Sequence, residues 1–292
     1  MRYIKNFFLI FSIFFTFELM IASTASANSS GKCPQGDGTY DEAEIKGGGC
    51  DATPTLYEVT IYELYLCTSS PTIPTTSSAV VLTSCSKIFE NASGAVASVS
   101  QNASISLSGT YTKPPNGTYT HGYAKMNNTF GLTWSGELDA AMTGLTGGTG
   151  VFCATVAGSG VYQQGTKHDD NSVCGSSAIT PGKYVETLKH LDGVSAAFKP
   201  NTLITDINNN AGAEIRGLLV DTSGNLATNT ADVDKLEGLV KFASSITVTD
   251  QTTSIEMSFN LGEGLFLEEN DSDDKLWIGS GPFEAIMKAS SN

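Results

Sequence analysis

Residues 56–67, LYEVTIYELYLC, decide the fold class of this chain. Tyr57, Val59 and Ile61 occupy every second position, a period of two that is typical of a β-strand with one buried face. Both faces become apolar toward Leu66. The segment therefore predicts a strand that is half exposed at one end and buried at the other, as in the middle of a sandwich sheet.

A second strand with strict alternation is predicted at Ser254–Leu261, where four apolar residues are separated by polar ones. Asn127-Asn128 predicts the turn of a hairpin, residues 137–142 predict a short helical turn, and residues 236–242 fit either a strand or a helix. Further strands are predicted at 79–89, 105–107, 119–126, 129–134, 151–156, 184–188, 194–198, 214–220 and 246–249.

The composition indicates an all-β protein. Glycine is abundant, with 30 residues, and charged residues make up only 16% of the chain, which is typical of an exported β protein with many turns. Strands do not alternate with helical segments, which argues against a parallel α/β fold.

The first 27 residues predict a secretory signal peptide. Arg2 and Lys5 form a basic start, an apolar run covers residues 7–17, and small residues at 25–27 provide a cleavage site after Ala27. Cleavage there sends the mature chain to the extracellular space, the cell surface or the periplasm. No later segment has the apolar length of a membrane span.

The sequence divides into four regions. Residues 1–27 are the predicted signal peptide, 28–53 a polar arm that contains two cysteines, 54–174 a β-sandwich region, and 184–290 a second β-rich region. The turn-forming segment between the last two regions is either a boundary between tandem sandwich units or a crossover inside one large domain.

The charge of the mature chain limits its partners. Removal of the signal peptide leaves 14 basic and 29 acidic residues, a net charge of −15. Such a surface repels phosphate backbones and anionic membranes, so nucleic acid is not an expected partner. An extracellular protein or a glycan is the expected class of partner.

Six cysteines, an even number, follow the predicted cleavage site. In an exported protein they predict three disulfides rather than a metal site, since no pair has the C-x-x-C spacing of zinc ligands. Six cysteines allow 15 pairings. We favour neighbours in sequence, because each pair closes a loop of similar modest size: Cys33 with Cys50, Cys67 with Cys85, and Cys153 with Cys174.

No cofactor is expected, and an acidic cluster near the C-terminus is the candidate site for calcium. Carboxylate and amide oxygens are the ligands that calcium prefers, and so many adjacent charges repel one another without a cation. The alternative is a hydrated acidic loop. The predicted ligands are Glu268, Glu269, Asp271, Asp273 and Asp274. A weaker calcium-loop pattern at Asp206, Asn208 and Asn210 is followed by Ala211, where a calcium loop has glycine.

No catalytic motif is present in the sequence. There is no G-x-S-x-G, and the glycine-rich stretch 144–150 lacks the Lys-Ser/Thr of a phosphate-binding loop. The three histidines, His121, His168 and His190, have no recognisable catalytic partners. We therefore predict that the chain is not an enzyme.

Three stretches resemble a loose set of exported bacterial β-sandwich domains, many of them from marine bacteria, in which strands begin with a Pro-x-Gly-x-Tyr-Thr turn. They are YEVTIYELYLC (57–67), PPNGTYTHGYAKMNNTFGL (114–132) and SITVTDQTTSIEMSFNLGEGL (245–265). The resemblance extends over residues 54–287 in scattered blocks. It implies a transthyretin-like or immunoglobulin-like β-sandwich and brings no known activity with it.

These observations together predict a secreted, non-catalytic surface or extracellular protein with a structural or adhesive role. One alternative is a carbohydrate-binding module, calcium-assisted or not, which requires an exposed row of aromatic side chains. A second is a polymerising appendage subunit whose arm reaches into a neighbour, and a third is a secreted hydrolase.

Overall fold

The computed structural model describes residues 33, 38–163, 171–191, 203–270 and 274–291. The predicted signal peptide and the predicted strand at 194–198 lie outside these residues. The described chain is nearly all β, as the sequence predicts, and consists of two large sheets and a two-stranded sheet. Its helices are the short α1, Glu42–Lys46, and two 3-10 turns at Ile207–Asn209 and Thr230–Asp232.

The largest sheet has nine strands among the described residues. Seven of them follow the order β11-β12-β13-β5-β2-β3-β4, while β10 pairs with both β5 and β8. The bounds are β2 Leu56–Cys67, β3 Cys85–Val99, β4 Thr110–Tyr111, β5 Gly117–Thr133, β8 Gly158–Tyr162, β10 Tyr184–Leu188, β11 Ile204–Thr205, β12 Glu214–Val220 and β13 Lys235–Val248.

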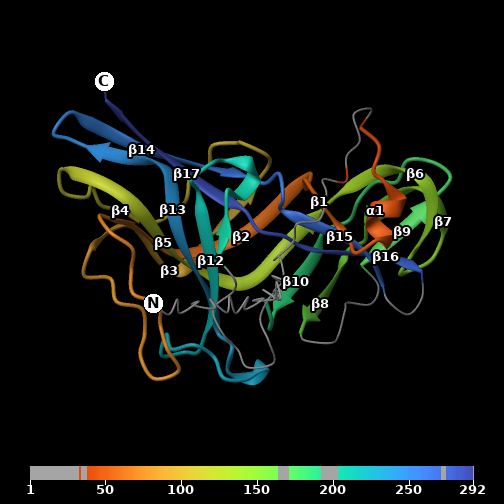
Figure 1. The fold of residues 1–292 in the computed structure, drawn as a ribbon, viewed down its shortest axis with the longest axis horizontal. Coiled ribbons are helices and arrows are strands. Elements are labelled where there is room, and N and C mark those ends of the chain that lie inside the picture. Colours follow the sequence, from red (N-terminus) through yellow and green to blue (C-terminus); the bar gives the residue numbers. More distant parts are fainter. Residues whose placement is uncertain (1–32, 34–37, 164–170, 192–202, 271–273, 292) are drawn as a thin grey trace, which may run out of the picture.

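A six-stranded sheet with the order β1-β15-β16-β6-β7-β9 lies beside it. Figure 1 places β6, β7 and β9 at one end of the molecule, and the two-stranded sheet β14-β17 at the other end. The bounds are β1 Cys50–Ala52, β6 Ser135–Gly144, β7 Thr149–Thr155, β9 Ser172–Gly175, β15 Leu265–Asn270, β16 Lys275–Ser280, β14 Thr252–Asn260 and β17 Glu284–Ser291.

Strands from both predicted β regions share both large sheets. In the nine-stranded sheet β5 pairs with β13 and with β10, and in the six-stranded sheet β6 pairs with β16. The arm joins the same sheet, because β1 pairs antiparallel with β15. Segments that are distant in sequence are therefore held together by long-range strand pairing.

The predicted disulfide pairing is confirmed. Sulfur–sulfur bonds join Cys33 to Cys50, Cys67 to Cys85, and Cys153 to Cys174, and none of the six cysteines is free. The second bond links paired residues of β2 and β3, and the third links paired residues of β7 and β9.

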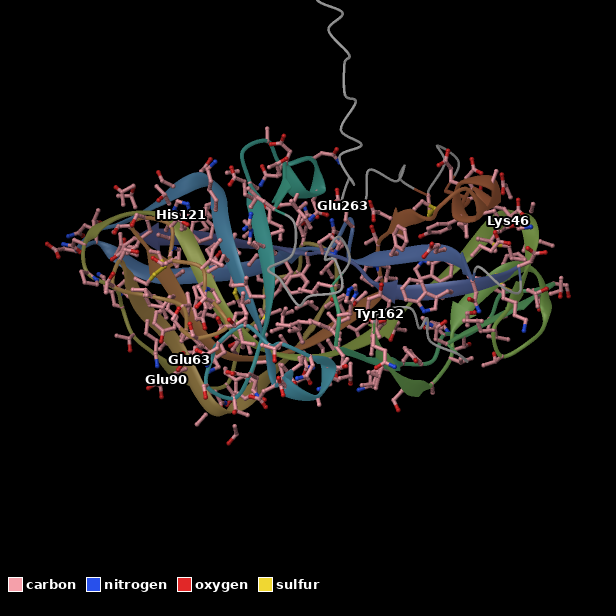
Figure 2. All side chains as sticks on the ribbon, turned by 60° about the horizontal axis from the view of Figure 1, so that its bottom comes forward. Lys46, Glu63, Glu90, His121, Tyr162 and Glu263 are labelled. Carbon is pink, nitrogen blue, oxygen red and sulfur yellow. A yellow bond between two sulfur atoms is a disulfide. The ribbon has the colours of Figure 1, made fainter. Side chains whose placement is uncertain are left out.

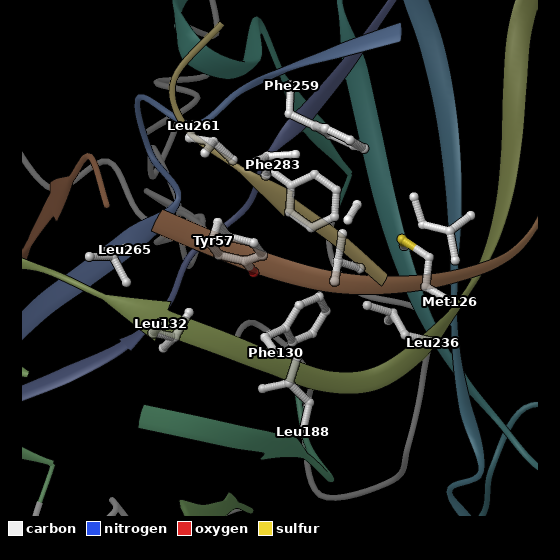
Figure 3. Close-up of a cluster of buried hydrophobic side chains, with 14 of the residues drawn as sticks. Tyr57, Met126, Phe130, Leu132, Leu188, Leu236, Phe259, Leu261, Leu265 and Phe283 are labelled. Atoms are coloured by element: carbon white, nitrogen blue, oxygen red, sulfur yellow. The ribbon is translucent and has the colours of Figure 1, made fainter. Parts of the chain in front are cut away.

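The core contains the alternate residues that the sequence predicts to be buried. Tyr57 on β2 and Phe130 on β5 have ring centroids 5.4 Å apart, and both pack close to Phe283 (Figure 3). On β14 the alternation also holds, with Met257 and Phe259 buried. No helix in the described part of the chain is long and apolar enough to cross a membrane.

Several local predictions are wrong. Residues 119–134 do not form a hairpin around Asn127-Asn128, because β5 runs through both asparagines as one strand. Residues 137–142 lie in β6 and are not helical. β3 begins at Cys85 rather than at residue 79, and residues 105–107 form no strand. The ambiguous segment 236–242 is part of strand β13.

Candidate functional site

The described residues surround an apolar cavity of about 140 Å³ between the nine-stranded sheet, β16 and the segment that follows it. Its walls come from nine strands and their connections. The lining residues are Tyr57, Met126, Phe130, Tyr162, Glu186, Leu188, His190, Leu191, Ile204, Ile215, Gly217, Leu236, Glu237, Gly238, Phe266, Trp277, Ser280, Gly281, Pro282 and Phe283.

Strand β10 supplies the polar end of this cavity. Tyr184, Glu186 and Leu188 are buried on one face of β10, and His190 continues the same alternation beyond the strand. The register places Glu186 opposite Phe130 of β5, so a carboxylate lies directly beside the aromatic core. A glutamate in the buried register of a predicted strand is the sequence signal that identifies this position.

The carboxylate of Glu186 is 1% exposed and is bound by Ser280. Its Oε2 accepts a hydrogen bond from Ser280 N at 3.0 Å and another from Ser280 Oγ. Burial raises the pKa of Tyr57 well above its ordinary value, the nearby charge of Glu186 raises it further, and a hydrogen bond with Ser280 opposes both effects. Two segments 94 residues apart are thus joined by a buried polar contact.

Aromatic side chains form another wall of the cavity. Tyr162 on β8 stacks on Trp277 of β16, with ring centroids 5.6 Å apart and planes 28° apart. His190 lies 6.1 Å from Tyr162 between ring centroids. Figure 2 shows Tyr162 between the end of the molecule that carries His121 and the end that carries Lys46.

Two glycines on facing positions of β12 and β13 leave the space that becomes the cavity. Gly217 and Gly238 are paired in the register of the two strands and both line the cavity. The flanking pairs on the same face are Ile215 with Val240 and Leu219 with Leu236, which carry large side chains. The pair Gly217–Gly238 therefore contributes no side chains to this face of the sheet.

The hydroxyl of Ser280 is bound to a carboxylate, whereas the serine of a serine hydrolase is bound to an imidazole. Such an enzyme needs a serine hydroxyl that donates to an imidazole, and the imidazole in turn is held by a carboxylate. Here Ser280 Oγ donates directly to Glu186. The contact fixes the end of β16 against β10.

His121 lies outside this site. His121 lies on β5, where Thr120 Oγ1 is 2.8 Å from its Nδ1; burial and the charge of Lys241 lower the pKa of its ring. His168 lies outside the described residues. Sequence reasoning attached no role to His190, which is the histidine that lines the cavity.

Three of the five predicted calcium ligands, Glu268, Glu269 and Asp274, lie in the described part of the hairpin β15–β16. Glu268 and Glu269 are consecutive residues of β15, so their side chains point to opposite faces of the strand. Glu269 shares a hydrogen bond with Asp274, which raises the pKa of the Glu269 carboxyl. Asp271 and Asp273 lie outside the described residues, and the described part holds no cluster of three or more metal-binding side chains. Calcium binding here stays a prediction.

In the weaker calcium-loop pattern, the side chains of Asp206 and Asn208 accept hydrogen bonds from backbone N–H groups. Asp206 Oδ1 accepts from Gly212 N at 2.7 Å, and Asn208 Oδ1 accepts from Glu263 N at 2.8 Å. These oxygens hold their own loop and the start of the β14–β15 connection. Such contacts are typical of asparagine and aspartate in turns.

The aromatic residues considered for a glycan platform are mostly internal. Trp134 and Trp277 are 1% and 3% exposed, and Tyr57, Tyr119 and Tyr123 are also buried. Among the large aromatic side chains in the described residues, Tyr111 is the one that is mainly exposed, at 60%. A single exposed ring does not make the row on which sugars stack.

A second, larger cleft of about 420 Å³ lies at the β14 end of the molecule. It is bordered by β14 and by the segment 104–113, and Phe89 and Met287 contribute to its apolar lining. Its rim carries the oppositely charged Lys113 and Glu256.

Comparison of the chain with models of known protein families, with curated proteins and with solved structures gave no match.

Proposed function

We propose that this chain is an exported β-sandwich protein without catalytic activity that has a structural or adhesive role outside the cell. The observation that carries the proposal is the use of all six cysteines in three disulfides. Disulfides persist in oxidising compartments and are rare where thiols are kept reduced. The predicted signal peptide also indicates export to an oxidising compartment.

The absence of activity is supported by how the buried polar groups are used. Glu186 holds Ser280, and Asn171, Ser172 and Thr155 bind backbone groups of neighbouring strands. Such bonds make an all-β protein rigid, because a hydrogen bond in a low-dielectric interior is stronger than one in water. A rigid, cross-linked scaffold suits a protein that bears load or presents a surface.

The appendage alternative depends on the arm. Its described part lies on its own chain: β1 pairs with β15, and Tyr40 forms a bridge with Leu138 of β6. The carbohydrate alternative has less support, because both tryptophans are buried. We therefore favour a role in which the assembled sandwich surface, rather than a strand donated by the arm, makes contact with the partner.

The test is the assembly state of the purified, oxidised mature protein, by light scattering and negative-stain microscopy, together with adhesion to the cells that export it. Ordered assemblies or retention on cells support the proposal. A monomer that stays free in the medium overturns it, and so does hydrolysis of ester, peptide or glycoside substrates at a rate that the Glu186→Gln variant loses.

A further inference from the structure

The cavity beside β10 has the features of a ligand site. Its space arises where the paired residues Gly217 and Gly238 have no side chains. A β carbon built on Gly238 would meet Met126 Cε at 3.5 Å, which is ordinary van der Waals contact, so the backbone there accepts at least the methyl group of alanine. Protein interiors are close-packed, and unfilled volume lowers stability. Glycine inside a strand weakens the strand and often marks a place where a ligand approaches the backbone.

The walls next to the glycines are hydrophobic. Met126, Phe130, Leu188 and Leu236 belong to the buried core and surround the gap on the cavity face of the sheet (Figure 3). A cavity of about this volume accepts a group as large as a benzene ring. The stacked rings of Tyr162 and Trp277 add flat surfaces that suit an aromatic guest.

The other end of the cavity is polar. Glu186 is almost fully buried, and its position is fixed by the two hydrogen bonds from Ser280. A carboxylate is a hydrogen-bond acceptor, and in a buried position a charge-assisted bond is stronger than a neutral one. A guest with a donor group at one end complements this arrangement.

We propose that the cavity binds a small aromatic molecule with one hydroxyl or ammonium group, its ring against Gly217 and Gly238 and its donor directed to Glu186. The site is separate from the structural or adhesive role and does not depend on it. Its ligand is held by hydrophobic contact and one directional hydrogen bond, with no covalent step.

The test uses two probes of similar shape, p-cresol and toluene, titrated into the oxidised full mature protein and followed by calorimetry and by thermal shift. We expect saturable binding of both and about tenfold tighter binding of p-cresol, because a hydrogen bond to a charged acceptor contributes that much. No saturable binding of either probe overturns the proposal. Equal affinity overturns the role of Glu186 as the acceptor.

Three variants make the test specific. Gly238→Val fills the gap and should abolish binding of both probes while raising the melting temperature; if it does not fold, Gly238→Ala should weaken binding in the same way. Gly117→Val is the matched control, since a β carbon there lies 3.9 Å from Tyr119 at the start of β5, away from the cavity. Glu186→Gln should remove the advantage of p-cresol and leave toluene binding unchanged. Unchanged binding in Gly238→Val overturns the assignment to this cavity.

Discussion

The carboxamide of Asn171 takes the place of a strand partner for Ile278. Asn171 Nδ2 donates to Ile278 O at 2.5 Å, and Ile278 N donates to Asn171 Oδ1 at 3.4 Å. β16 pairs with β6 at Lys275 and Leu276, so Ile278 lies beyond this short ladder. Both Asn171 and Ile278 are buried, and one side chain therefore satisfies a donor and an acceptor that water does not reach.

We expect Asn171→Ala to lower the free energy of unfolding by about 3 kcal/mol, because it leaves the N–H and C=O of Ile278 buried without partners. Urea denaturation of the oxidised protein measures the change. Asn116→Ala is the control: its side chain is exposed and bonds Asp250 on the surface, so the loss should stay within about 0.5 kcal/mol. Equal losses in the two variants would contradict this role of Asn171.

The sequence predicts most of the strands, since period-two alternation depends on local burial, but it fails at Asn127-Asn128. Two adjacent asparagines favour a turn. In the structure β10 lies against β5 at this point, and buried Asn128 donates from Nδ2 to Leu188 O at 2.7 Å. A contact with a residue 60 positions away outweighs the local preference, and no local pattern contains that information.

The cavity was not predictable for a related reason. Glu186 is visible as a glutamate among alternating buried residues, but its partner Ser280 comes from a different sheet. The space beside the two glycines also requires Gly217 and Gly238 to lie opposite each other. That depends on the register in which β12 and β13 pair. The disulfides were predictable because neighbouring cysteines close short loops, and each pair fits that rule.

The second prediction concerns Glu237, which is 2% exposed and whose side chain points to the face of β13 opposite to that of its neighbour Leu236. Burial raises the pKa of Glu237 to about 7, while a hydrogen bond from Tyr123 and the charge of Lys125 oppose the rise; the charge of Glu63 adds to it. The folded state therefore holds a proton that the unfolded state releases near its ordinary value of 4.5.

Because the folded pKa of Glu237 is raised, its stabilising effect is fully present below pH 4.5 and is lost as the pH rises through about 7. The contribution is roughly 3 kcal/mol. Glu237→Gln should remove this pH dependence and be more stable than the native chain at pH 8. Urea denaturation at several pH values measures it, with Glu256→Gln on the exposed side of β14 as the control. A pH profile that Glu237→Gln leaves unaltered would count against the assignment.

The third prediction concerns the disulfide between Cys67 and Cys85, which closes the loop that covers part of the outer face of the large sheet. Ile73 in this loop packs on buried Leu218, Val220 and Leu226. Replacement of both cysteines by alanine should lower the free energy of unfolding by about 3 kcal/mol in the chain-entropy model.

Intact mass after alkylation provides the check on pairing. The native oxidised protein should take up no alkylating reagent, and the double variant should also take up none, since the other four cysteines stay paired. Free thiols in the native protein would be incompatible with three disulfides. A double variant as stable as the native chain would show that the loop needs no covalent closure.

The last prediction concerns how the arm is held. The ring of Tyr40 meets Trp134 edge to face at 5.1 Å, and Trp134 Nε1 donates to Tyr40 Oη at 3.1 Å. Tyr40→Ala should release the arm and make trypsin cut after Lys46 about tenfold faster, because cleavage follows local opening. Tyr40→Phe keeps the ring and should show a smaller increase. Gly136→Ala gives an independent test, since its β carbon would lie 2.6 Å from the Tyr40 ring. If all three variants are cut at the native rate, these contacts do not hold the arm, and its attachment depends on β1 and the Cys33–Cys50 bond.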